Sequence, residues 1–329
     1  MGYVWALLTN RQFSIDITHP CPLTSIVEPN VIFWNKSIKC YDYFSNVVET
    51  ESQNFSSVLI NKMNDFGYLT EFKNLSLIDY FSNVNLLILK ANLDYIQPLS
   101  ENPALKEKIL SLGLVDKIED FKIVSLFRRV YNKLFKLRPE YDKQFQNFKI
   151  KAKANKTTKL FCVQIRIGGS RPHVGGDRKF TLRNNSKLFW DFIRSTIIND
   201  EENYKLFVTS DTESVANESL DEFGEEKVVM IDGLYNHLDV GPSSKTSCKM
   251  YTKTFLDLHA FQLCDKVVVS RGGYGLMGAF LRENPFQEFY RYTEIHTKTE
   301  DVKTFIKLEN LKELEENLQH EIDWVKSLK

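Results

Sequence analysis

The chain has 329 residues, enough for one large or two mid-sized domains with a substantial buried core. Its 43 Lys and Arg residues cancel 43 Asp and Glu residues, so no overall electrostatic attraction draws it to nucleic acid or anionic lipid. This length excludes a disulfide-stapled mini-protein. Hydrophobic residues make up 43%, aromatic residues 13% and charged residues 26%, a composition that excludes a disordered chain.

Targeting signals are sparse in this sequence. It contains no apolar run near the roughly 18 residues that span a bilayer, so the chain itself is expected to be soluble. Met1 to Arg11 lack the features of a signal peptide and read as the middle of a helix, as if an upstream segment were missing. N-glycosylation sequons favour a secretory lumen, although a chain so rich in Asn, Ser and Thr contains some by chance. They begin at Asn35, Asn54, Asn74, Asn155, Asn184 and Asn217.

The N-terminal half begins with a predicted helix over residues 3–9 and an alternating strand over residues 13–17. A second strand candidate covers residues 85–90, and residues 103–150 show helical apolar spacing. Cys21 and Cys40 are a candidate disulfide if the compartment is oxidising.

A polar, lysine-rich stretch over residues 149–156 is interpreted as a linker. It divides the chain into predicted domains at 1–153 and 154–329.

The C-terminal half alternates strands with helices. The pattern predicts strands at 160–167, 204–210, 227–231 and 266–270, and helices at 187–199, 213–223, 252–264 and 276–282. Such repeated units indicate an α/β fold with a mainly parallel sheet covered on both faces, and ligands at the carboxyl ends of the strands. Leu311, Leu314 and Leu318 or Ile322 predict an amphipathic closing helix.

Two polar residues close the first of these strands. Gln164 and Arg166 are two positions apart and so point to the same side of the strand. A guanidinium suits a diphosphate because its planar fork donates two parallel hydrogen bonds; the alternative is an Arg paired with a neighbouring carboxylate. Gly168-Gly169 and Gly175-Gly176 permit close backbone approach or a mobile loop, but neither pair forms a dinucleotide-binding or ATP-binding glycine motif.

Two carboxylates stand out further along. Asp211 closes the next strand, where the simpler interpretation is an N-cap of the following helix. Asp257 interrupts an apolar helical segment, and a buried carboxylate requires hydrogen-bond donors. A guanine edge offers two such donors; the alternative is an internal bond to Lys, Tyr or His, with His259 as one candidate.

The last predicted strand leads into Ser270-Arg271-Gly272-Gly273-Tyr274-Gly275 and then a helix. A small, Gly-rich turn before a helix N-terminus favours an anion, although a plain tight turn explains the glycines nearly as well. The histidines are scattered and the cysteines lack CxxC spacing, so no metal site is predicted.

Three segments resemble, in the same order along the chain, the three motifs of the GDP-fucose-dependent fucosyltransferases that form α1,2, α1,6 and protein O-linked fucose. They are residues 161–168, residues 206–211 and residues 255–274. Residues 5–16 are similar to the first helix and strand of the plant xyloglucan α1,2-fucosyltransferases. Gln164, in place of the histidine of α1,6 and bacterial members, also favours this plant-like branch.

The resemblance implies a GT-B architecture, with two Rossmann-like domains facing a cleft and GDP-fucose held mainly by the C-terminal one. Arg166 then binds the pyrophosphate and neutralises charge on the departing GDP, beside Gln164. Asp257 holds the guanine, and Asp211 lies in the second motif with a less defined contact. The phosphate-side turn consists of Ser270, Gly272, Gly273 and Tyr274. The family is inverting and needs no metal, so GDP-fucose is the donor substrate and no cofactor is expected.

Two departures from the family pattern qualify this inference. The family has a Gly-rich phosphate loop before the first helix, which this sequence starts too late to contain, and Ile167-Gly168 replace a second Arg and an Asp-Lys pair. The favoured function is transfer of L-fucose to a glycan hydroxyl, α1,2 to galactose, in the Golgi lumen, with a membrane anchor only upstream of this chain. The rivals are a catalytically silent nucleotide- or glycan-binding protein and, more distantly, an unrelated Rossmann nucleotide enzyme.

Overall fold

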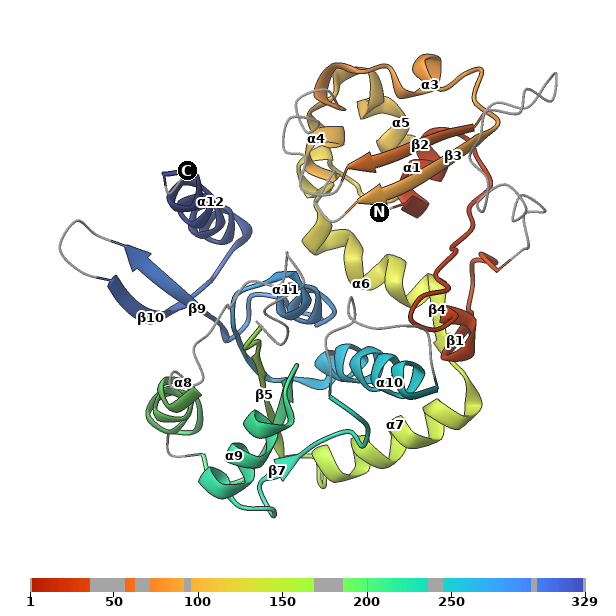
Figure 1. Ribbon diagram of the computed structural model, residues 1–329. Helices are drawn as coiled ribbons and strands as arrows, with labels where there is room; N and C mark the ends of the chain where they lie inside the picture. The colour runs from red at the N-terminus through yellow and green to blue at the C-terminus, as the bar shows by residue number, and fades with distance from the viewer. Residues whose placement is uncertain are drawn as a thin grey trace. The chain divides into compact units, whose positions relative to one another are not determined.

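A computed structural model describes residues 2–35, 57–62, 72–91, 96–168, 186–199, 201–235, 245–296 and 301–327 (Figure 1). The chain forms two compact units. The first contains Met1–Asp16 and Glu28–Lys136, and the second contains Ile17–Val27 and Leu137–Lys329. Two short strands, β1 (Val27–Pro29) and β4 (Phe135–Leu137), pair where the chain passes between the units.

The first unit places helices beside a two-stranded parallel sheet. Its elements are α1 (Gly2–Leu8), β2 (Ser57–Lys62), α3 (Leu77–Tyr80), β3 (Leu86–Ala91), α4 (Ile96–Glu101), α5 (Lys106–Ser111) and α6 (Ile123–Leu134). The apolar face of α1 is buried because Trp5 packs edge-on against Phe72, with 4.7 Å between ring centroids. The predictions of a helix at 3–9 and a strand at 85–90 are confirmed.

The predicted strand over residues 13–17 is wrong. In the structure this segment is irregular, and Ile15 donates one backbone hydrogen bond to the Trp34 carbonyl, at 3.1 Å. A strand requires a continuous ladder with a neighbour. Alternation of apolar and polar residues therefore does not suffice to make a strand here.

The second unit contains a six-stranded sheet of order β10-β9-β8-β5-β6-β7. Its strands are β5 (Lys159–Ile165), β6 (Tyr204–Ser210), β7 (Val228–Val229), β8 (Lys266–Val269), β9 (Phe289–His296) and β10 (Asp301–Lys307). All neighbours pair in parallel except β9 and β10, which form an antiparallel hairpin at the edge. The mainly parallel sheet is as predicted, whereas the hairpin was not anticipated.

Helices cover both faces of this sheet (Figure 1). They are α7 (Pro139–Ala152), α8 (Ser186–Phe192), α9 (Glu213–Phe223), α10 (Lys245–Ala260), α11 (Gly273–Phe280) and α12 (Leu311–Ser327). Alternate residues of β6 face opposite layers: Val208 packs in the core beside α8 and α9, whereas Phe207 contacts Phe148 of α7 at 5.1 Å. The closing helix is present as α12.

The expected linker is not a linker. Residues 149–152 are the last turn of α7, and its aromatic side chains Phe145 and Phe148 pack against His259 and Phe207 of the sheet unit. The compact units consequently divide at 136/137 instead of after Lys153, because the buried face of α7 ties it to the second unit.

Two disulfides cross-link the second unit. Cys162 of β5 bonds to Cys264, and Cys21 bonds to Cys248 of α10. The hypothesis that Cys21 pairs with Cys40 is therefore wrong; Cys40 itself lies outside the described residues. Within the described part of the chain, no helix is long and apolar enough to cross a membrane.

Candidate functional site

Three parallel strands bring the predicted site residues to one edge of the sheet. Gln164 of β5 is in register with Thr209 of β6 on one side and with Val269 of β8 on the other. Because the strands are parallel, their carboxyl ends meet at this edge, and the residues that follow them are neighbours.

Ser270 is the centre of a hydrogen-bond network at this edge. It is fully buried; its backbone N–H donates to the Gln164 carbonyl at 2.8 Å and its hydroxyl donates to Gln164 Oε1 at 3.1 Å. The Ser270 hydroxyl also accepts the backbone N–H of Arg166 at 2.8 Å. Ser270 thereby fixes the backbone from which the Arg166 side chain projects.

The glycine turn lies directly against Arg166. Gly272 has φ +114°, a conformation that favours glycine, and a Cβ placed there would lie 3.5 Å from Arg166 Nη1. Gly273 begins α11, and among the described residues no atom outside its own helix turn lies within 4 Å of the Cβ position there. Gly272 and Gly273 therefore add no side chain to the turn that lies beside the guanidinium.

Gly275 is a residue of this site that the sequence interpretation left without a role. A Cβ at Gly275 would lie 2.6 Å from Gln164 Oε1 and 2.8 Å from Val269 Cβ. Glycine is required because the first turn of α11 packs directly on these side chains. Its position within the Ser270–Gly275 run was the signal that could have identified it.

Tyr274 anchors α11 to α10. Its hydroxyl donates to the Thr254 carbonyl at 2.8 Å, and its ring packs edge-on against Phe261 at 6.5 Å. The Tyr274 side chain thus positions the glycine turn by fixing α11 on α10.

Asp211 supports the segment that follows β5. Its two carboxylate oxygens accept the backbone N–H groups of Ile167 and Gly168, each at 2.9 Å. The N-cap of α9 is Thr212, which accepts the Ser214 N–H. The N-cap interpretation of Asp211 is therefore wrong, and the carboxylate holds the backbone of Ile167 and Gly168 next to Arg166.

Asp257 is held in a buried ion pair. Its Oδ2 accepts from the Thr209 hydroxyl at 2.8 Å and from Lys253 Nζ at 2.8 Å, and Oδ1 accepts from the same Nζ at 3.1 Å. Asp257 is 2% exposed, and burial raises the pKa of its carboxyl, opposed by the charge of Lys253. The alternative of an internal bond is what the structure shows, with Lys253 as the partner.

His259 is not that partner. It packs on the ring of Phe145 at 4.6 Å, and its Nδ1 lies 3.1 Å from Gln262 Nε2. Burial lowers the pKa of His259 to about 4, so the imidazole is neutral at physiological pH.

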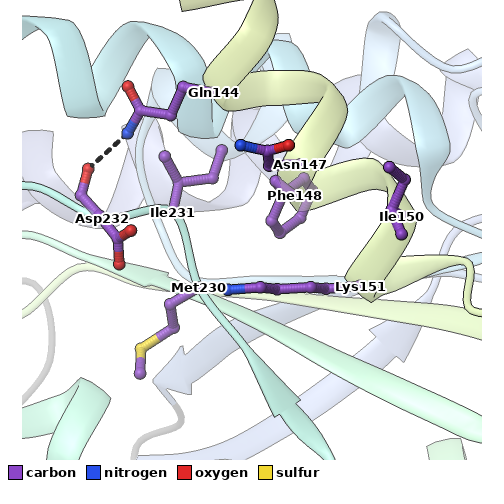
Figure 2. Close-up of a pocket in the computed structure, with 8 residues that line it drawn as sticks. All are labelled: Gln144, Asn147, Phe148, Ile150, Lys151, Met230, Ile231 and Asp232. Carbon is purple, nitrogen blue, oxygen red and sulfur yellow. Dashed lines mark hydrogen bonds between the residues drawn. The ribbon is translucent and has the colours of Figure 1, made fainter.

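Two cavities lie beside α7 and the segment after β7, and the second is also lined by α10. One has a volume of about 310 Å³ and is lined by Gln144, Asn147, Phe148, Ile150, Lys151, Met230, Ile231 and Asp232 (Figure 2). The other, of about 420 Å³, is lined by Tyr141, Gln144, Asp232, Gly233, Leu234, Lys249, Thr252 and Lys253.

Gln144 and Asp232 line both cavities, and Gln144 Nε2 donates to the Asp232 carbonyl at 3.0 Å (Figure 2). No predicted site residue lines either cavity, but the second reaches Lys253, the partner of Asp257. Among the residues that the structure describes, no group of three or more His, Cys, Asp or Glu side chains could hold a metal ion.

Comparisons with known proteins find similarity in structure. No protein-family model and no curated protein sequence matches the chain. Its structure is similar to that of an Arabidopsis thaliana FUT1 mutant in complex with GDP, with a TM-score of 0.61 and 13% identity over 92% of this chain and 68% of that chain. It is also similar to the NodZ α-1,6-fucosyltransferase soaked with GDP-fucose, with a TM-score of 0.49 and 12% identity over 93% and 91% of the two chains. A further NodZ structure, of the fucosyltransferase from Bradyrhizobium, gives a TM-score of 0.49 and 13% identity over the same shares.

Of these, the similarity to FUT1 is close enough to show a shared fold. It confirms the predicted α/β, GT-B-like class.

Proposed function

We propose that the chain is a GDP-fucose-dependent fucosyltransferase that transfers L-fucose to a glycan hydroxyl with inversion, α1,2 to galactose, without a metal ion. The observation that carries the proposal is the placement of Arg166. It follows the strand β5 and lies against the Gly272 turn, in a fold shared with GDP-bound FUT1.

In this mechanism the second unit holds the nucleotide sugar and the first unit provides the acceptor side. The bond between fucose C1 and the diphosphate oxygen breaks, and GDP departs with the electron pair. A new C1–O bond forms on the opposite face of the sugar with the acceptor hydroxyl, whose proton passes to a base or to solvent. Arg166 donates to the diphosphate and stabilises the charge that develops on it.

The other predicted site residues support the proposed contact between Arg166 and the diphosphate. Gln164 and Ser270 fix the strand ends, and Asp211 holds the two residues that follow Arg166. Gly272 and Gly273 offer backbone N–H groups at the start of α11. Tyr274 holds α11 in place. For Asp257 to read the guanine edge, its bonds to Lys253 must give way, so base recognition involves both residues.

The decisive experiment measures donor use. The chain is incubated with GDP-fucose and a galactose-terminated oligosaccharide, and the product is analysed by mass spectrometry and by linkage-specific glycosidase digestion. GDP-mannose is the matched control, because it shares the nucleotide and differs in the sugar. Fucosylated product with an α1,2 linkage supports the proposal; product from GDP-mannose alone, or from UDP-sugars, contradicts it.

A second candidate function is a nucleotide- or glycan-binding protein without turnover. The Lys253–Asp257 pair favours it, since a carboxylate occupied by an internal lysine is less available to a base. A rise in melting temperature with GDP, but not with UDP or ADP, together with no transfer to any acceptor, would favour this function.

We also propose that the protein acts in the Golgi lumen. Two disulfides between residues distant in sequence require an oxidising compartment to form and persist.

A further inference from the structure

A second arginine stands beside Arg166 at the carboxyl edge of the sheet. Arg166 lies two residues after Gln164, and Arg271 lies two residues after Val269, the register partner of Gln164. The chain neighbours of Arg271 lie beside Arg166: the Ser270 hydroxyl accepts the Arg166 backbone N–H at 2.8 Å, and a Cβ built at Gly272 would lie 3.5 Å from Arg166 Nη1. Two arginines therefore directly follow neighbouring strands, Arg166 after β5 and Arg271 after β8.

Arg271 is held by a carboxylate on the next strand. Its Nη1 lies 3.4 Å from Oε2 of Glu294 on β9, and the two side chains are 15% and 18% exposed. The other oxygen, Oε1, accepts from the Tyr292 hydroxyl at 2.9 Å. Tyr292 is fully buried and packs against Phe189 at 5.3 Å, so the carboxylate is fixed to a rigid part of the core.

The Arg271–Glu294 pair differs from a surface ion pair because both side chains are largely buried and a second hydrogen bond holds the carboxylate. Positive charges at neighbouring strand ends both attract an anion, and Glu294 offsets the charge of Arg271 in part. A guanidinium fork fits the oxygen geometry of a phosphate, and Glu294 limits the conformations of the Arg271 side chain before a ligand arrives. A diphosphate supplies enough negative charge and oxygen acceptors for two arginines.

We propose that Arg271, positioned by Glu294, is a second phosphate-binding residue of this site and contacts the diphosphate of the nucleotide together with Arg166. The inference rests on the proposed function, since it takes the ligand to be a nucleoside diphosphate. It assigns Arg271 a contact with the ligand and assigns Glu294 and Tyr292 the positioning of that contact.

The test measures GDP binding by calorimetry, with inorganic pyrophosphate as a probe of the phosphate contacts alone. Replacing Arg271→Met should weaken GDP and pyrophosphate binding by about tenfold or more, because a hydrogen bond to a charged group is lost. Arg271→Lys should recover part of the affinity, since it keeps the charge and loses the fork. The matched control is Arg194→Met, which removes an arginine ion-paired with Glu222 away from the strand ends and should leave both affinities unchanged.

A charge-matched variant distinguishes a direct contact between Arg271 and the diphosphate from mere neutralisation of Glu294 by Arg271. In Arg271→Met with Glu294→Gln, the net charge of the site equals that of the unchanged chain. Continued loss of GDP and pyrophosphate binding in this double variant supports the contact. Recovery of full affinity would show that Arg271 merely neutralises Glu294, and would overturn the inference.

The remaining outcomes are also distinguishable. If Arg271→Met lowers the melting temperature but leaves GDP affinity intact, the ion pair only ties β9 to the glycine turn and the inference fails while the proposed function stands. If the unchanged chain binds no GDP, the proposed function fails and this inference fails with it.

Discussion

At the scale of single residues, the proposed mechanism gives the Arg166 side chain a role in transfer and none in folding. Its backbone N–H is bound by Ser270, a bond that does not need the side chain, so Arg166→Ala should leave the melting temperature nearly unchanged. Fucose transfer should fall by about 100-fold or more, because electrostatic contacts to a departing group contribute on that order.

Steady-state transfer assays and thermal unfolding of the same Arg166→Ala preparation check both expectations. Arg166→Lys should restore little activity, since the bidentate geometry is lost. Retention of more than about a tenth of the activity in Arg166→Ala would exclude the proposed role, given the size of such contacts.

Asp257 forms a buried ion pair with Lys253, and the proposed function gives it a second role in guanine recognition. Asp257→Asn leaves the Lys253 ammonium buried without a counter-charge, so the free energy of unfolding should drop by about 3 to 5 kcal/mol. The paired variant Lys253→Met with Asp257→Leu removes both charges and should recover most of that stability. Urea unfolding measures both.

The same paired variant tests base recognition. If Asp257 also reads guanine, the recovered protein should bind GDP, UDP and ADP alike. An unchanged preference for GDP would make the ion pair purely structural.

At the scale of elements, the packing of α7 on α10 makes stability depend on pH. His259 has an ordinary pKa of 6.5 in the unfolded chain and a pKa of about 4 in the folded one, because burial against Phe145 disfavours the cation. The unfolded chain therefore binds a proton first as the pH falls. Stability is fully present above the unfolded pKa and is lost as the pH falls toward the folded pKa.

Between about pH 7.5 and about pH 5, this one group should remove about 2 kcal/mol from the free energy of unfolding. Asp142, whose charge acts in the opposite direction, reduces the effect without reversing it. The control is His259→Phe, which keeps an aromatic ring against Phe145 and cannot titrate. An equal pH dependence in the variant and the unchanged protein would assign the effect to other groups.

At the scale of the whole molecule, two covalent links restrict the unfolded chain. The Cys21–Cys248 bond spans 227 residues of sequence and the Cys162–Cys264 bond spans 102. Because loops of this length lose much entropy on closure, reduction should lower the melting temperature by more than about 5 °C.

Peptide mapping of the unreduced protein should recover these two linkages. The variants Cys21→Ser with Cys248→Ser, and Cys162→Ala with Cys264→Ala, divide the effect between them. A peptide that joins Cys21 to Cys40 would contradict the structure.

The proposed mechanism as a whole assigns the leaving-group charge to arginines and backbone N–H groups. Transfer should accordingly persist in EDTA, with kcat/KM within about twofold of the untreated protein, because no step is assigned to a cation. Added manganese should not raise the rate. A strict requirement for manganese would contradict the mechanism. A melting curve recorded in EDTA shows whether any loss of activity comes from unfolding of the protein instead.

The sequence by itself determined the local organisation of the second unit. Strand-length apolar runs alternating with helical spacing predicted β5, β6 and β8 and the helices between them, because these periodicities reflect which side of each element is buried. Because Arg166 and the glycine turn each follow a predicted parallel strand, the sequence also indicated that they lie at the same edge of the sheet. Even the Lys253–Asp257 spacing of four on one helix was available as a signal.

Tertiary structure alone decided the features that depend on distant partners. Asp211 binds the loop after β5, Glu294 reaches Arg271, and Cys21 meets Cys248, although none of these pairs is close in sequence. The predicted strand at residues 13–17 did not form, because strand formation depends on a paired neighbour. Local patterns specify which face of an element is buried, and only the folded chain determines what covers that face.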